Sequence, residues 1–262
     1  MNRGFILLLV VGFLFGGAVV LWLRSGSPPP ATLQTVEDAT PEPASTSDAR
    51  FLILAASWQP AFCETASNRQ ECRTQTANRY DATHFALHGL WPQADYCGVS
   101  QVVEQRDREG RWSQLRPVEL PVEMQKRLEQ TMPGTRSQLE RHEWTKHGTC
   151  YGTEEQKYFS DALALMDALN TSAVQKLFAD NLGNEITQAR IREAFDTAFG
   201  VGAGERVRIA CETDGERELI SELTIGLYAA PGDAADLREW VNAARPTNGG
   251  CLRGIVDPAG LQ

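Results

Sequence analysis

The sequence predicts an α+β fold, in which a central antiparallel sheet is flanked by several helices. Strand-like segments lie at both ends of the globular part of the chain, and helix-like segments lie between them. The composition is ordinary for a globular protein, since 42% of the 262 residues are hydrophobic and 23% are charged. The six cysteines form no C-x-x-C pair, which disfavours a zinc ribbon and favours three disulfides formed in an oxidising compartment.

An uncharged and mostly apolar run covers residues 5–23. A helix of this length would span about 28 Å, close to the hydrocarbon thickness of a bilayer. Two interpretations stay open for residues 1–24: a signal peptide cut after the small residues at 16–18, and an uncleaved membrane anchor that ends at Arg24. In both cases we expect the rest of the chain to be exported, to the periplasm or the cell exterior.

The next segment, residues 25–49, is rich in Pro, Ser, Thr and Ala and has no apolar periodicity, which predicts a disordered linker. A single domain is expected over residues 50–262, because this length suffices for one core and is short for two. Its first strand is the apolar run at residues 50–58, which stops before Pro60. A second strand is expected over residues 84–91.

That second strand alternates loosely between apolar and polar residues and ends at Pro92. Residues 98–121 show no such pattern and are expected to form a loop. Five helices are expected to follow, of which residues 154–169 have the clearest amphipathic pattern. The helices are expected at 122–132, 137–149, 154–169, 171–182 and 187–199, and three closing strands at 206–211, 219–228 and 252–256.

Three of the four histidines lie in two unusual strings, FALHGLWP at residues 85–92 and HEWTKHGTC at residues 142–150. If the second string is helical, Glu143 lies above His147 and His142 lies above Lys146 on one side of the helix. Such a cluster suits acid–base chemistry on an anion. The H-E-x-x-x-H spacing turns the two rings about 140° apart and disfavours a shared zinc ion. A solvated charged helix face is the alternative interpretation.

These two strings resemble the active-site segments of the ribonuclease T2 family, and SWQPAFC at residues 57–63 resembles the first strand and first half-cystine of that family. The resemblance covers about residues 51–151; the remainder resembles the family only in its helices and last two cysteines. It implies a ribonuclease T2-like, monomeric endoribonuclease of low base specificity that needs neither a metal nor another cofactor.

The resemblance also implies the reaction. A base removes the proton of the RNA 2′-hydroxyl, the oxygen attacks the adjacent phosphorus, and an acid protonates the departing 5′-oxygen. The product is a 2′,3′-cyclic phosphate, which water can open to a 3′-phosphate. Single-stranded RNA is the expected substrate and DNA, which lacks the nucleophile, is not. The alternative is a non-catalytic exported RNA-binding or interaction protein on the same fold.

By this resemblance His147 is the general base and His88 the general acid, although the reverse assignment stays open. His142 would hold the phosphate. Glu143 and Lys146 would stabilise the negatively charged transition state, and Glu143 would also orient or tune the base. The non-catalytic alternative predicts the loss of a residue in this set, and all five are present.

Two aromatic residues are implied to bind bases. Trp91 would stack on a nucleobase, an interaction that tolerates any base, and Tyr96 would add a second aromatic wall. Gln93 stands where fungal members have a base-reading aspartate, so we expect no strict base preference. Trp112 is assigned to the core or its rim.

The resemblance further implies the disulfide pairing, which the cysteine spacing alone leaves open. The expected pairs are Cys63–Cys72, Cys97–Cys150 and Cys211–Cys251. The formal net charge of −9 disfavours a protein that grips nucleic acid along a basic surface. A nuclease that touches its substrate briefly at one site needs only local positive charge, so an RNA substrate is still compatible with an acidic chain.

Overall fold

The computed structural model describes residues 50–229 and 233–261. The expected signal or anchor segment at residues 1–24 and the expected linker at residues 25–49 lie outside these described residues. Among the helices that are described, none is both long enough and apolar enough to cross a membrane.

The described strands form one six-stranded sheet with the order β2–β1–β5–β6–β3, and β4 pairs with β5. The antiparallel arrangement expected from the sequence is wrong in one detail, because β5 and β6 are parallel and the sheet is mixed. Helix α9 lies between these two strands in the chain and supplies the crossover that a parallel pair needs. The strands are β1 (Arg50–Ser57), β2 (Ala86–Pro92), β3 (Glu185–Thr187), β4 (Val207–Asp214), β5 (Arg217–Ala229) and β6 (Arg253–Ile255).

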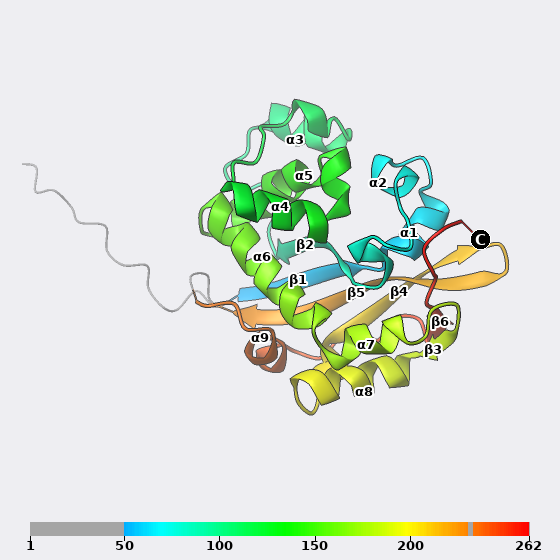
Figure 1. The fold of residues 1–262 in the computed structure, drawn as a ribbon. Coiled ribbons are helices and arrows are strands. Elements are labelled where there is room, and N and C mark those ends of the chain that lie inside the picture. The colour runs from blue at the N-terminus through cyan, green and yellow to red at the C-terminus, as the bar shows by residue number, and fades with distance from the viewer. Residues whose placement is uncertain (1–49, 230–232, 262) are drawn as a thin grey trace, which may run out of the picture. The chain divides into compact units, whose positions relative to one another are not determined.

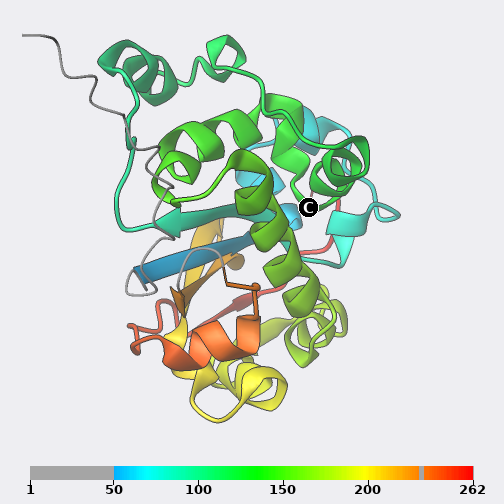
Figure 2. The same ribbon diagram turned by 90° about the vertical axis from the view of Figure 1, so that its left-hand side faces the viewer.

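Figures 1 and 2 show α3, α4 and α5 grouped near β2, with α7, α8 and α9 on the other side and α6 running between the two groups. The five helices expected from the sequence are present with shifted ends, and α1, α2, α3 and α9 are additional. The described helices are α1 (Gln59–Thr65), α2 (Gln70–Arg73), α3 (Gln101–Arg108), α4 (Val122–Thr131), α5 (Leu139–Lys146), α6 (Glu155–Asn170), α7 (Ala173–Ala179), α8 (Gln188–Phe199) and α9 (Leu237–Ala243).

The loop predicted over residues 98–121 is wrong, because this segment contains α3. Its residues are mostly polar, and Asp107 is the one buried residue of the helix. An amphipathic apolar stripe is what reveals a helix in a sequence. This helix presents a buried carboxylate instead of such a stripe, so its pattern resembles that of a loop.

Helix α6 holds the strand that carries the first histidine string. The Asn170 side chain accepts a hydrogen bond from Phe85 N (2.8 Å) and donates one to Phe85 O (2.9 Å). Further along the same helix, the buried Tyr158 hydroxyl donates to Leu90 O (3.0 Å). These bonds satisfy backbone groups that burial would otherwise leave unpaired. They also fix the position of β2 relative to the helical layer.

A β-bulge interrupts the pairing of β1 and β2. Ala55 pairs with Gly89 and Ala56 pairs with Leu87, so His88 is the extra residue of the bulged strand. Bulges redirect a side chain that regular alternation would point elsewhere, and they are common next to active sites. The strand alternation expected over residues 84–91 is therefore broken at the histidine itself.

The three disulfides are those implied by the family resemblance: Cys63–Cys72, Cys97–Cys150 and Cys211–Cys251. The second joins the loop after β2 to the turn after α5, over a sequence separation of 53 residues. A closed loop of that length is worth about 4 kcal/mol in the chain-entropy treatment of disulfides. It ties together the two segments that carry the histidine strings.

A buried acidic group away from these segments makes stability depend on pH. Asp257 is fully buried beside Arg217. Burial and the nearby Glu64 carboxylate raise the pKa of Asp257 to about 6, against the opposing effect of Arg217. The folded state therefore binds this proton more tightly than the unfolded chain does. The stabilisation that protonated Asp257 provides is complete below the ordinary pKa of 3.8 and is lost as the pH rises through about 6.

Asp257→Asn, which imitates the protonated carboxyl group, should therefore be more stable than the wild type at pH 8 and similar to it at pH 4. The gain at pH 8 is expected to be at most about 3 kcal/mol. Urea unfolding at both pH values measures the difference, with Asp180→Asn on the exposed end of α7 as the control. A variant that is less stable at pH 8 would contradict the raised pKa.

Candidate active site

The two histidine strings meet at the end of β2 and the end of α5. Helix α5 is shorter than the predicted 137–149, because it ends at Lys146 and His147 forms its cap with φ −107° and ψ −48°. His147 keeps an αR conformation and donates its N–H to Glu143 O at 3.0 Å, and a 3-10 turn follows at Gly148–Cys150. The prediction that ring divergence keeps His142 and His147 apart is wrong, since one ligand atom from each of them and from Glu143 lies within 4.8 Å of the others.

Glu143 lies at the centre of the cluster and is 1% exposed. Its Oε2 accepts a hydrogen bond from Trp91 Nε1 at 2.8 Å. Its Oε1 has no hydrogen-bond partner among the described residues and lies 3.9 Å from His88 Nε2 and 3.8 Å from His142 Nε2. Burial raises the pKa of Glu143, against the nearby histidines. Oε1 therefore faces the same space as two imidazole nitrogens.

His88 is held from the side opposite Glu143. Its Nδ1 donates to Glu222 Oε2 at 2.6 Å, because a carboxylate can only accept. Burial disfavours the imidazolium, but the hydrogen bond to Glu222 and the negative charge of Glu143 outweigh burial and raise the pKa of His88. The ring keeps Nε2 available toward the cluster, and 37% of the side chain is exposed.

His147 has the opposite electrostatic environment. It is 6% exposed, and burial together with the charges of Lys146, His142 and His88 lowers the pKa of His147 to about 3. Its Nδ1 approaches Asp95 Oδ1 at 3.1 Å without forming a hydrogen bond. The pKa shifts of the two histidines are thus opposite: His147 tends to be neutral, and His88 tends to be charged.

His142 is held by a carboxylate that no sequence pattern indicates, Asp107, and by the ring of Trp112. Its Nδ1 donates to the Asp107 carboxylate of α3 at 2.8 Å, and its ring stacks on Trp112 with 4.7 Å between centroids. The Tyr96 hydroxyl donates to the same carboxylate at 2.8 Å. The assignment of Trp112 to the core or its rim therefore leaves out a direct contact with the site.

The two predicted base-binding residues lie in different surroundings. Trp91 is half-buried inside the cluster, with its ring centroid 5.0 Å from that of His88 and 5.5 Å from that of His147. Tyr96 is half-buried beside α3, and the Arg108 guanidinium carbon lies 4.8 Å from its ring centroid. Each of these two side chains thus packs against another side chain of the protein, besides its predicted contact with a base.

The atoms around Glu143 Oε1 enclose a space that a phosphate oxygen or a small cation could occupy by distance. The charge of the surroundings decides between them. His88 and Lys146 contribute positive charge to this space, as their effect on His147 shows. Positive groups converging on one point favour an anion. The arrangement can therefore hold a phosphate between a proton acceptor and a proton donor.

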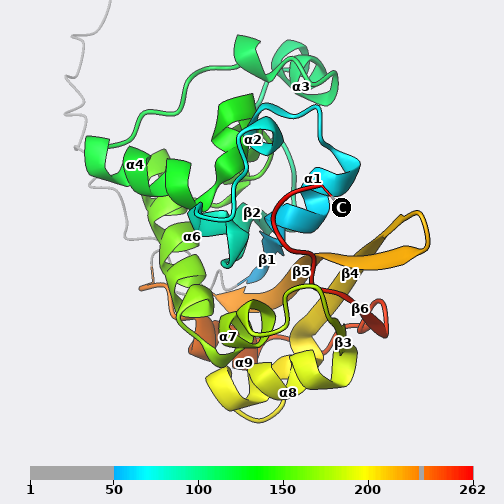
Figure 3. The same cartoon turned by 45° about the vertical axis from the view of Figure 1, so that its right-hand side comes forward.

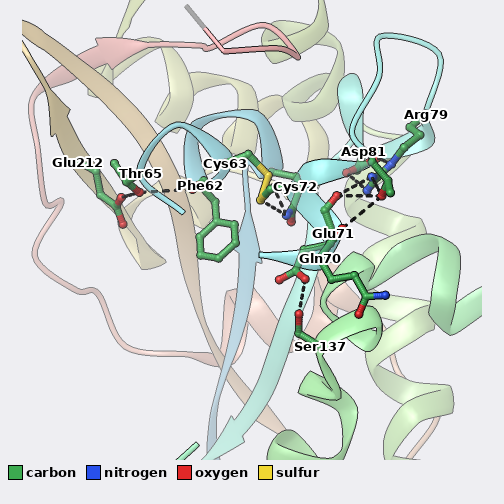
Figure 4. Close-up of a disulfide and its surroundings, with 12 residues drawn as sticks. Phe62, Cys63, Thr65, Gln70, Glu71, Cys72, Arg79, Asp81, Ser137 and Glu212 are labelled. Carbon is green, nitrogen blue, oxygen red and sulfur yellow. Dashed lines mark hydrogen bonds and ion pairs between the residues drawn. A yellow bond between two sulfur atoms is a disulfide. The ribbon is translucent and has the colours of Figure 1, made fainter. Parts of the chain in front are cut away.

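A cavity of about 330 Å³ opens beside His88 and Glu222. Its far wall includes Phe62, which neighbours the Cys63–Cys72 disulfide, as Figure 4 shows. Helices α1 and α2 form this wall, and α1 packs against β5, which Figure 3 brings forward. The cavity therefore extends the site from His88 and Glu222 toward α1 and α2, and Leu139 of α5 also contributes to its lining.

The supporting carboxylates are the residues that sequence reasoning misses. Glu222 carries a usable signal, because it is the one charged residue in the apolar strand predicted at 219–228. Asp107 has no comparable signal, since it lies among other polar residues of α3. Asp95 follows the first histidine string closely but matches no pattern quoted for that string.

The family model, the similar sequences and the similar structures reported below are all of ribonucleases. The model of the ribonuclease T2 family matches residues 49–238. The chain is similar to ribonuclease I of Escherichia coli strain K12, with 29% identity over 79% of this chain and 86% of the relative. It is also similar to intracellular ribonuclease LX of Solanum lycopersicum, with 26% identity over 64% of this chain and 68% of the relative.

Solved structures with the same fold include the self-incompatibility associated SF11-RNase of Nicotiana alata, with a TM-score of 0.54 and 18% identity over 80% of this chain and 100% of that one. RNase NT, solved in complex with 5′-AMP, gives a TM-score of 0.51 and 19% identity over 80% of this chain and 99% of that one. At these identities the likeness concerns the fold.

Proposed function

Because this chain belongs to the ribonuclease T2 family, we propose that it is an endoribonuclease that cleaves single-stranded RNA through attack of the 2′-hydroxyl on the adjacent phosphate. The observation that carries the proposal is the convergence of His88 Nε2 and His142 Nε2 on Glu143 Oε1, at 3.9 and 3.8 Å, with His147 buried beside them. The site retains every group that the reaction uses, which disfavours a non-catalytic binding protein.

The proton positions support one assignment of roles. His147, whose pKa is lowered, is neutral and can accept the 2′-hydroxyl proton as general base. His88, whose pKa is raised, is protonated and can donate a proton from Nε2 to the departing 5′-oxygen. The nucleophile belongs to the substrate, so this route uses neither a nucleophilic side chain nor a metal ion.

The remaining groups act on the phosphate. His142, held by Asp107, directs Nε2 toward a phosphate oxygen, and Lys146 adds positive charge as the five-coordinate transition state forms. Glu143 Oε1 lies 3.9 Å from His88 Nε2 and 3.8 Å from His142 Nε2, where the carboxylate orients both imidazoles toward the phosphate. Trp91 holds Glu143 in this orientation, and its half-buried ring lies where a neighbouring base could stack. Tyr96 helps to hold His142, because its hydroxyl donates to Asp107. We also propose Tyr96 as a second contact for a base.

The nature of the products tests this reaction. An RNA oligonucleotide should give products that end in a 2′,3′-cyclic phosphate, with cleavage unchanged in excess EDTA. The same oligonucleotide with 2′-O-methyl groups should not be cut, because the nucleophile is blocked. Mass spectrometry of the products distinguishes these outcomes, and cleavage of the methylated strand or loss of activity with EDTA would reject the mechanism.

The pH dependence of kcat/KM should be bell-shaped with an acidic optimum. Activity should rise as His147 loses its proton, near pH 3, and should fall as His88 loses its proton, above the ordinary imidazole pKa of 6.5. Initial rates on a dinucleoside monophosphate between pH 3 and 9 measure both limbs. A maximum on the alkaline side would contradict the assigned protonation states.

The targeting segment and the linker complete the proposal. Export of the domain at 50–262 is supported by its three disulfides, which persist in oxidising compartments. Residues 1–24 would direct export as a signal peptide or keep the monomeric enzyme at the membrane through the linker at 25–49. The N-terminal mass of the exported protein distinguishes these two, because cleavage removes the apolar segment.

A further inference from the structure

Glu222 lies next to a second irregularity of the sheet, in the strand that borders β1 on the side away from β2. Ala210 on β4 pairs with Glu222, but the next residue, Cys211, pairs with Ile220, so Ser221 is the extra residue of β5. His88 is likewise the extra residue of β2. The two bulged strands lie on either side of β1, so each bulge changes the direction of the side chains that cross it.

The Glu222 carboxylate contacts both of the strands β1 and β2. Its Oε2 accepts from His88 Nδ1 at 2.6 Å and from the Ser57 hydroxyl of β1 at 3.1 Å. Ser57 is the direct cross-strand partner of Glu222. One oxygen of a carboxylate that is 18% exposed therefore holds the histidine from the strand two positions away in the sheet. Glu222 is the one charged residue between Leu219 and Tyr228 of β5, and it lies against a reacting histidine, so its place requires an explanation beyond packing.

We propose that Glu222 is the positioning residue of His88. Its carboxylate accepts a hydrogen bond from Nδ1–H, so that the transferable proton is the one on Nε2, facing the phosphate. This inference rests on the proposed function, in which His88 is the general acid. The carboxylate fixes which ring nitrogen reacts, keeps the ring at a set angle across the bulge and stabilises the charged imidazolium.

The other charges around His88 determine what the loss of Glu222 would do. Glu143 on α5 also favours the imidazolium, whereas Lys146 on the same helix opposes it. Burial of the ring opposes it as well. Without the Glu222 charge, the Glu143 carboxylate alone remains against Lys146 and burial. An opposite charge at hydrogen-bond distance shifts a pKa by about 1–3 units.

Glu222→Gln is the informative substitution, because the amide oxygen can still accept from Nδ1 while the charge is removed. We expect the alkaline limb of the kcat/KM profile to move down by at least about one unit. At pH 8 the rate should fall about tenfold or more relative to wild type, whereas at pH 5 it should stay within about threefold. The acidic limb, which belongs to His147, should not move.

The His88 pKa itself should be followed by NMR in the full chain, using the imidazole Cε1–H signals. The chain has only four histidines, and loss of one signal in His88→Ala assigns the relevant one. Glu218→Gln is the matched control: it removes the same charge from β5, at a glutamate that accepts from the Thr213 hydroxyl instead of a histidine. Its titration curve and rate profile should match those of the wild type.

The outcomes separate the two proposals. A lower His88 pKa together with a lower alkaline limb supports both. A lower pKa with an unmoved alkaline limb supports the Glu222 contact but rejects His88 as the general acid. An unchanged His88 pKa rejects the positioning role. Glu222→Asp, which keeps the charge on a shorter side chain, provides the same NMR test should the glutamine variant fold poorly, with an expected pKa between those of wild type and Glu222→Gln.

Discussion

His88→Ala and His147→Phe should each lower kcat/KM for RNA cleavage by about 10²–10⁴-fold at the optimum pH. The first substitution removes the group that protonates the leaving oxygen. The second removes the proton acceptor but keeps a ring of similar size in a position that is 6% exposed, so packing is largely retained. The loss corresponds to a barrier increase of at least about 3 kcal/mol for each histidine.

The fourth histidine provides the control. His84 stacks on Tyr80 with 4.1 Å between centroids, and its Nδ1 lies 3.0 Å from Tyr80 O, so its contacts lie outside the cluster. His84→Ala should keep near-wild-type rates. The double variant of the two catalytic histidines should lose little more than either single variant, because acid and base act on one transition state. Full activity in either single variant, or strictly multiplicative losses, would contradict a paired acid–base mechanism.

The sequence predicts those residues of the site that lie close together in the chain, within one short segment. The string at residues 142–150 predicts a helix with titratable groups on one side, and the structure places His142 and Glu143 on α5 as expected. The expected stacking of Glu143 over His147 assumed that the helix continues. Helix α5 ends at Lys146, just before His147, and one ring nitrogen of His147 lies within 4.8 Å of one of His142.

The residues that hold the histidines come from distant parts of the chain, and no local pattern predicts them. Glu222 reaches His88 across β1, from 134 residues further along the chain, and His88 is itself the extra residue of a bulge. Asp107 reaches His142 only because a polar segment folds as a helix. A bulge depends on the pairing of two strands, so neither strand shows it when it is analysed alone. The sequence thus predicts which groups react but not which groups orient them.

Gly89→Ala should inactivate the enzyme for a reason that the string at residues 85–92 does not itself reveal. A Cβ at this position would overlap Glu143 Oε2 and Trp91 Nε1, which are joined by a hydrogen bond. Gly89 follows the bulged residue of β2 but is not among the glycines with positive φ, so the requirement for glycine is one of space and not of conformation. Displacing the central carboxylate by about 1 Å is expected to lower kcat/KM by about 10²-fold.

Stability should change by a smaller amount, about 1–3 kcal/mol, because the substitution overpacks one contact and leaves buried Glu143 without its hydrogen bond. Gly226→Ala on β5 is the matched control, since a Cβ there would meet its nearest neighbour, Arg206 O, at an ordinary 3.5 Å. Rates and urea unfolding of both variants separate damage to the site from damage to the sheet. Wild-type activity in Gly89→Ala would mean that Glu143 need not be held by Trp91, and the central position given to that carboxylate would then be wrong.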